Sequence, residues 1–165
     1  MGRKSTKENK NIYQLSREAT GLSRADAQDV TLLSPDRIAD IEAGKLPHAD
    51  EVVAMANGYK DPFLCNYYCA QECAIGCNNV ALQDKGKNLT KISIEMLNAL
   101  NYLEDEQRRF MEIVEDEKID FHELADFQNI QARFQKMEST IESLQLWIKQ
   151  NELDGKMPNS PLQSR

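Results

Sequence analysis

The chain has 165 residues, of which 41% are hydrophobic, 7% aromatic and 28% charged, and this composition suits an all-α protein. The net charge is −7, but residues 1–60 are balanced by nine Lys/Arg and nine Asp/Glu, so the acidic excess lies in the remainder. Because no apolar run approaches the length of a membrane span and no signal-peptide core precedes the first helix, we expect a cytoplasmic protein with reduced cysteines and no membrane partner.

Residues 1–10 form a basic segment that we expect to be disordered when free. Such a segment is either a solvated tail or an arm that lies on a phosphate backbone. Residues 11–20 are predicted to form a first helix that ends at Gly21. Its apolar face is predicted to hold Ile12, Leu15 and Ala19.

Residues 22–45 are predicted to form two short helices that meet at a tight corner. Ser23 is a good N-cap, and Asp26 completes a weak capping box. Ser34 caps the second helix, with Pro35 at its first position, and Gly44 favours a left-handed turn at its end. Such closely joined helices cross steeply, as in a helix-turn-helix motif. The residues predicted to point inward are Ala27, Val30, Leu33, Ile38 and Ile41.

The same stretch resembles the lambda-repressor/Cro-like family of helix-turn-helix regulators, also called XRE. The matching pieces are Gly21-Leu22-Ser23, Leu33-Ser34-Pro35 and Ile38-x-x-Ile41-Glu42-x-Gly44-Lys45, followed by Leu46-Pro47. The resemblance covers roughly residues 11–76. Two departures are Leu32, where the turn usually has Gly, and Ala27-Gln28, where Leu-Ala is usual. Leu32 implies a less open or a shifted turn above a thinner core.

The resemblance implies a five-helix domain over residues 11–77 that binds double-stranded DNA and regulates transcription. The second motif helix is then expected to enter the major groove, while the first lies over the backbone. Because acidic side chains stand at two of the three reading positions, an alternative is an interaction or scaffold protein that no longer reads DNA. The DNA-binding residues implied by the resemblance are Ser23, Arg24, Ser34, Asp36, Arg37, Asp40 and Lys45.

Two further helices are predicted after the corner. One opens at Pro47 and stops at Asn57-Gly58, with Val52, Val53, Met55 and Ala56 as its apolar side; the other runs from Asp61-Pro62 to about Gly76. The second carries four cysteines at four-residue steps. They are interpreted as small buried residues, with Cys69 and Cys73 the most buried, because one straight helix cannot close four thiolates on one metal. Metal binding and redox sensing are the alternatives, with weak candidate ligands Cys65, Cys69, Cys73 and Cys77.

Residues 78–90 are predicted to be a linker, and residues 91–152 a coiled-coil-like module of two long helices. The first helix has a heptad seam of Met96, Leu100, Leu103, Gln107, Phe110 and Val114. Asp120 caps the second helix with Glu123 in the reciprocal position. We predict self-association through this module as a homodimer or higher oligomer, with an intramolecular hairpin as the alternative. The second seam, the predicted dimerisation surface, is Phe127, Ile130, Phe134, Met137, Ile141, Leu144 and Ile148.

The last segment, residues 153–165, is predicted to be a disordered tail. The sequence shows no Gly-rich phosphate loop, no H-E-x-x-H motif and no nucleophile–base arrangement. We therefore expect neither an enzyme, nor a cofactor, nor a bound metal. The chain is predicted to be all-α, with a five-helix helix-turn-helix domain followed by a long-helix module.

Overall fold

The computed structural model describes residues 9–157, without the side chains of residues 103–105, and every element of regular structure in that range is helical. The all-α prediction is therefore confirmed. Residues 1–8 and 158–165, which belong to the predicted tails, lie outside the described residues. Of the helices described, none combines the length and the apolar character that crossing a membrane requires.

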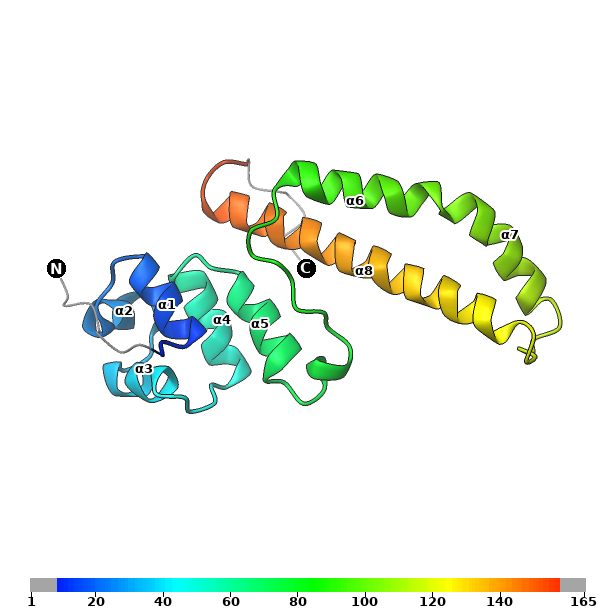
Figure 1. Ribbon diagram of the computed structural model, residues 1–165. Helices are drawn as coiled ribbons and strands as arrows, with labels where there is room; N and C mark the ends of the chain where they lie inside the picture. The colour runs from blue at the N-terminus through cyan, green and yellow to red at the C-terminus, as the bar shows by residue number, and fades with distance from the viewer. Residues whose placement is uncertain (1–8, 158–165) are drawn as a thin grey trace. The chain divides into compact units, whose positions relative to one another are not determined.

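The chain divides into two compact units (Figure 1). Of the described residues, 9–83 and 148–157 belong to the first unit, and 84–147 belong to the second. Part of the predicted linker belongs to the first unit, because Gln83 is buried and its backbone N–H donates to Oδ1 of Asn66 at 2.9 Å.

In the part of the chain that the structure describes, the first unit contains α1 to α5, a short 3-10 helix and the end of α8 (Leu124–Leu153). The bounds of the other elements are α1 Ile12–Ala19, α2 Arg24–Thr31, α3 Pro35–Glu42, α4 Ala49–Gly58, α5 Phe63–Gln71 and η1 Gly76–Asn78. One continuous core joins α1 to α5. It consists of Tyr13, Ala27, Ile38, Ile41, Val52, Met55, Ala56, Tyr59 and Leu64.

The inward faces of α1, α2 and α4 differ from those predicted. Leu15, Ala19, Val30 and Val53 are exposed, and the buried positions of α1 and α2 include polar residues instead. Gln14, Arg17 and Thr31 find hydrogen-bond partners inside the fold, whereas the buried Ser16 hydroxyl has none among the described residues. Thr31, for example, donates its hydroxyl to the Ala27 carbonyl at 2.7 Å. The buried residues are Tyr13, Gln14, Ser16 and Arg17 on α1, and Ala27 and Thr31 on α2.

The predicted fifth helix ends early. It was expected to run to about Gly76, but α5 stops at Gln71, and Cys73 N–H bonds back to the Tyr68 carbonyl at 2.8 Å. Glu72, the C-cap, accepts the Tyr13 hydroxyl at 2.6 Å, which ties this end to α1. The α5 start also differs, since Pro62 is the N-cap and no side chain caps the helix.

The second unit contains α6 Leu89–Asn101, α7 Leu103–Val114 and most of α8 Leu124–Leu153. The single long helix predicted before Asp120 is wrong, because the chain breaks into α6 and α7 at Tyr102. At this break the Tyr102 ring lies 4.9 Å beneath the Arg133 guanidinium of α8. Asp120 and Glu123 form the predicted reciprocal hydrogen bonds, but they do so in the turn before α8, which begins only at Leu124.

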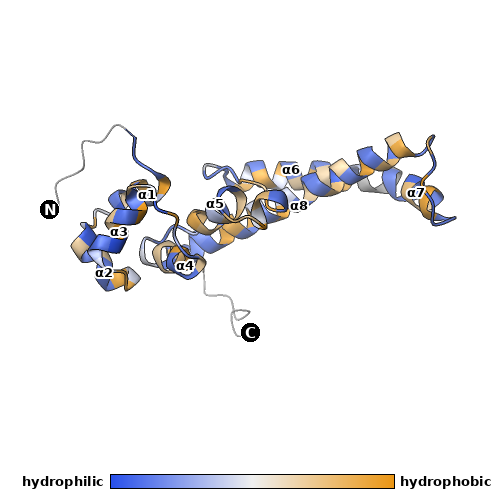
Figure 2. Ribbon diagram, turned by 90° about the horizontal axis from the view of Figure 1, so that it is seen from below, coloured by the Kyte–Doolittle hydropathy of each residue, from blue (hydrophilic) through white to orange (hydrophobic). Residues whose placement is uncertain are grey.

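Within the second unit, α8 runs back beside α6 and α7 (Figure 1). Phe110 of α7 stacks on Phe127 at 6.3 Å between centroids and meets Phe134 edge-on at 5.8 Å. Arg109 also pairs with Asp126 at 2.8 Å. These contacts form the antiparallel hairpin that was the alternative to pairing between chains, and Figure 2 shows hydrophobic and hydrophilic residues interspersed along all three helices.

The predicted seam of α8 is only partly covered by this hairpin. Ile130 is buried at 3% exposure, whereas Phe134 and Ile141 remain 46% and 41% exposed. The other positions, Phe127, Met137, Leu144 and Ile148, are half-buried. Thr140 and Ser143 are buried in addition, so the inward face of α8 is more polar than the seam implies. The side chain of Leu103, a predicted seam position, lies outside the described residues.

Candidate functional site

The corner between α2 and α3 is built by local capping, as the sequence predicted. Ser23 and Asp26 form a reciprocal capping box, which holds the pKa of the Asp26 carboxyl below its usual value through the Ser23 side-chain hydrogen bond. Ser34 accepts from Arg37 N–H at 3.2 Å, and Pro35 occupies the first turn. Gly44 has a φ of +107°, which confirms the left-handed turn after α3.

Leu32 itself adopts the left-handed conformation that was expected to require glycine. It is the C-cap of α2, with φ 60° and ψ 17°, and its N–H bonds to the Gln28 carbonyl at 2.8 Å. The left-handed region is strained for a residue with a β-carbon, and the Leu32 side chain is 88% exposed, so no packing within the described residues offsets the strain.

A buried ion-pair cluster locks the corner to α1. Arg17 makes a two-pronged contact with Glu42 at 2.5 and 3.0 Å, and Arg24 contacts the same carboxylate at 2.8 Å. Arg17 also donates to the Leu22 carbonyl at 2.6 Å. Burial is the largest single influence on the pKa of Arg17 and lowers it, but the Glu42 hydrogen bond and the attraction of nearby acidic groups together outweigh it, so the net shift is upward. Three helices thus share one carboxylate.

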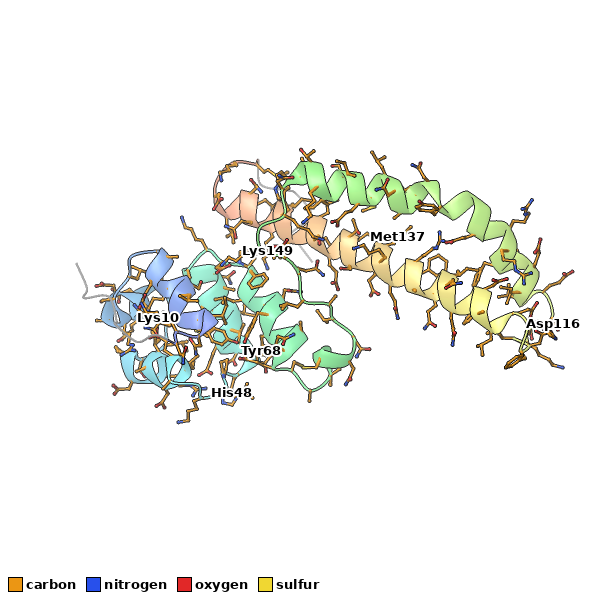
Figure 3. The ribbon with its side chains drawn as sticks, viewed as in Figure 1. Lys10, His48, Tyr68, Asp116, Met137 and Lys149 are labelled. Carbon is orange, nitrogen blue, oxygen red and sulfur yellow. The ribbon has the colours of Figure 1, made fainter. Side chains whose placement is uncertain are left out.

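Arg37 ties α3 to α4. Its Nε and terminal nitrogen reach the two Glu51 oxygens at 2.7 and 2.6 Å, and the same terminal nitrogen donates to the Leu46 carbonyl at 3.2 Å. Glu51 also accepts the N–H of His48, the α4 N-cap labelled in Figure 3, at 2.7 Å. The Arg37 hydrogen bond depresses the Glu51 pKa. Because both sides of the Arg37 guanidinium are hydrogen-bonded within the protein, this side chain has a structural role in the conformation described.

Lys45 pairs with Asp40 at 2.8 Å on the open side of α3. Both side chains are more than half exposed, at 65% and 53%, so the pair contributes little to stability. The hydrogen bond from Lys45 lowers the Asp40 pKa. Lys45 is free to exchange this partner for another anion at low energetic cost.

The structure brings the sequence-predicted DNA-binding residues onto one region around α3. Ser34, Asp36, Asp40 and Lys45 are exposed, and Ser23 lies half-buried at the start of α2. Each of the three cations in the set is already paired with a carboxylate, Arg24 with Glu42, Arg37 with Glu51 and Lys45 with Asp40. The charges of these three pairs cancel and the exposed Asp36 adds a negative charge, so the surface is close to neutral or acidic.

Sequence reasoning missed the two carboxylates that organise this region, Glu42 and Glu51. Glu42 lies 25 residues from Arg17, a separation that no local pattern reveals. Glu51 carried a readable signal, since it stands three residues after His48 at the capping-box position before an apolar helix. Its pairing with Arg37, 14 residues away, follows only from the fold.

The cysteines do not form one stripe on one helix. Cys65 and Cys69 lie on α5, Cys73 follows its end, and Cys77 lies in the exposed 3-10 turn. The prediction that Cys69 and Cys73 are the most buried is wrong, because Cys65 is the one that packs against the core. Burial raises the pKa of both Cys65 and Cys69. Among residues 9–157, no group of three His, Cys, Asp or Glu side chains is placed to hold a metal ion.

Gly76 explains how the chain turns back after α5. A β-carbon at this position would lie 2.2 Å from the Cys69 carbonyl oxygen. The Gly76 N–H meets the Cys73 sulfur at 3.5 Å, and Cys77 N–H bonds to the Cys73 carbonyl at 2.9 Å. The last two cysteines thus occupy a compact turn.

Comparisons of the chain with protein-family models, with curated proteins and with solved structures gave no match.

Proposed function

We propose that the first unit is a lambda-repressor-like helix-turn-helix module that docks α3 on duplex DNA, and that the protein regulates transcription as a self-associating regulator. The observation that carries the proposal is the division of α3 into two faces. Ile38 and Ile41 are each 1% exposed, whereas Ser34, Asp36 and Asp40 point away from the core. This exposed edge follows a capped corner, which is the arrangement that inserts a helix into a major groove.

Docking requires the cations to change partners. Arg24, whose side chain is 44% exposed, and Lys45 lie near the ends of the motif, where phosphates pass. Arg37 reaches a guanine only after leaving Glu51, while Asp36 and Asp40 can accept from a cytosine amine. Because each contact replaces an internal ion pair, we expect weak binding with a shallow salt dependence that reports only a few phosphates.

The test is duplex binding by the full chain at several salt concentrations, with charge-release variants. Glu51→Gln keeps the capping position but frees the charge of Arg37, so it should tighten binding several-fold if Arg37 is recruited to DNA. Glu138→Gln removes one negative charge from an exposed position of α8 and is the matched control. If both variants tighten DNA binding equally, the gain comes from the lower net negative charge of the protein and not from a contact of Arg37 with DNA.

A second candidate function is recognition of a protein partner by the same corner. It is favoured by Leu32 and Val30, which are 88% and 46% exposed beside the acidic side chain of Asp29. Backbone strain retained at an exposed apolar residue is a feature of functional surfaces. Absence of duplex binding at low salt by the folded, assembled chain would select this candidate over the first.

Self-association is proposed for the second unit because its hairpin leaves much apolar surface open. Ile92, Ile113 and Ile130 are buried, but several other apolar side chains on α6, α7 and α8 are exposed. Several large apolar side chains exposed on one small unit are a feature of interaction surfaces. The residues concerned are Ile94, Leu97, Leu100, Met111, Phe134 and Ile141, each at least 41% exposed.

A further inference from the structure

The second unit contains a cavity of about 380 Å³ between α6, the start of α7 and α8. Its wall is chiefly apolar and includes Ala99 and Tyr102 on one side, and Phe134 and Met137 on the other. Met137 is labelled on α8 in Figure 3. A volume in this range, with mostly apolar walls and a few polar groups at the mouth, matches sites for small organic ligands.

Most of the charges around this cavity neutralise one another. Arg133 contacts Glu106 at 2.5 Å, and its guanidinium covers the Tyr102 ring. Glu95 pairs with Lys87 at 2.8 Å. Lys136 differs from these groups, because its ammonium lies within ion-pair distance of no carboxylate among the described residues, although it lines the same cavity. Lys136 is therefore the lining cation that forms no ion pair with a carboxylate among the described residues.

We propose that this cavity binds a small carboxylic acid with an aromatic body. The carboxylate lies at the Lys136 ammonium, and the body fills the space between Tyr102, Phe134 and Met137. Aromatic walls favour a flat body through edge and face contacts, and the flexible Met137 side chain adapts to its outline. The site is independent of whether α3 binds DNA.

The charges also restrict the ligand class. Glu95 and Glu106 line the cavity as well, so a dianion such as a phosphate monoester meets two carboxylates for each unpaired cation. The Lys87 hydrogen bond, with a smaller contribution from Lys136, holds the pKa of Glu95 below its usual value, so this carboxylate stays charged near neutral pH. A cationic ligand would face Lys136 without a free carboxylate, since both acids are already paired.

The experiment is a titration of the full chain, followed by backbone amide NMR shifts, with 3-phenylpropionate and with its neutral amide, 3-phenylpropanamide. We expect saturable shifts centred on Ala99, Phe134 and Met137, with the acid bound about three- to fivefold more tightly, the ratio that one exposed ion pair supplies. Lys136→Gln should remove this preference and leave binding of the amide unchanged. Lys118→Gln, in the exposed segment between α7 and α8, is the matched control and should retain the preference.

A second pair of variants tests the cavity itself. Ala99→Leu places a larger side chain in the cavity and should abolish binding of both compounds, whereas Ala132→Leu adds the same side chain at an exposed position of α8 and should not. Circular dichroism on each variant confirms that the helices persist. The proposal fails if neither compound gives saturable shifts, if Ala99→Leu still binds, or if Lys136→Gln keeps the preference for the acid.

Discussion

The two units enclose their apolar residues to different degrees. The first unit gathers nine buried residues into one core and joins α1, α2 and α3 through the Glu42 carboxylate. In the second unit, the buried positions include Ile92, Ile113 and Ile130 together with the polar Thr140 and Ser143, while Leu97 and Met111 stay 59% and 61% exposed. The first unit therefore supplies its own stabilisation, and the second retains surface that a further partner can cover.

The largest expected effect is a loss of stability of the first unit. Glu42→Gln removes the carboxylate that neutralises Arg17, leaving a buried guanidinium without a counter-charge. Removing one partner of a buried pair costs about 3 to 5 kcal/mol, so urea unfolding should shift strongly to lower denaturant. Glu138→Gln on the exposed face of α8 is the control and should change stability little. A small shift for Glu42→Gln would show that water reaches Arg17.

The next largest effect concerns self-association through the second unit. Ile141→Lys places a charge on an α8 position that is already 41% exposed, so it should not unfold the hairpin. It should instead weaken self-association by about 1 to 3 kcal/mol if Ile141 lies in the interface. Sedimentation of the full chain measures the change. Glu138→Lys is the control on an exposed position, and a monomeric wild-type chain at tens of micromolar would overturn the proposal.

A smaller effect appears as a pH dependence of the first unit. The Arg37 hydrogen bond depresses the folded-state pKa of Glu51 below its unfolded value of about 4.3. The stability from this pair is therefore fully present above that pH and is lost as the pH falls through the folded pKa. The stability difference between wild type and Glu51→Gln should shrink between about pH 5 and pH 3. A constant difference across this range would mean that the pair contributes nothing.

The smallest effect concerns Leu32. A glycine at position 32 relieves the left-handed strain, which costs the folded state about 1 to 2 kcal/mol. It also raises the entropy of the unfolded chain, which lowers the free energy of unfolding by roughly 0.5 to 1 kcal/mol. Leu32→Gly should therefore raise the melting temperature slightly, and Leu32→Ala, which keeps the β-carbon, should not. If Leu32→Gly lowers stability, the exposed side chain makes a stabilising contact in the assembled protein.

The sequence predicted what short-range chemistry decides. Ser23 and Ser34 cap helices as expected, and Asp120 and Glu123 form the expected reciprocal hydrogen bonds, because these contacts join residues within one turn. The inner face of α1 was predicted wrongly, because Arg17 is buried through Glu42, a partner far along the chain. The break at Tyr102 carries neither glycine nor proline, so no local signal marked it.

The candidate site was less predictable than the fold. The resemblance of the motif indicates which residues belong to the site. It does not indicate whether Arg37 faces solvent or a carboxylate, because that depends on α4, which presents Glu51 to Arg37. The cavity in the second unit depends likewise on how α8 returns past α6. Heptad spacing identifies the helices that meet, but it does not give the volume left between them.

The turn at Gly76 limits which amino-acid substitutions this position tolerates. The Cys69 carbonyl occupies the place of a side chain there, so even alanine forces the backbone to move. Gly44 has nothing within 4 Å of an added β-carbon, and asparagine suits its left-handed conformation. In a library of all single substitutions, we therefore expect selection for folded protein to retain only glycine at position 76, but to retain asparagine as well as glycine at position 44.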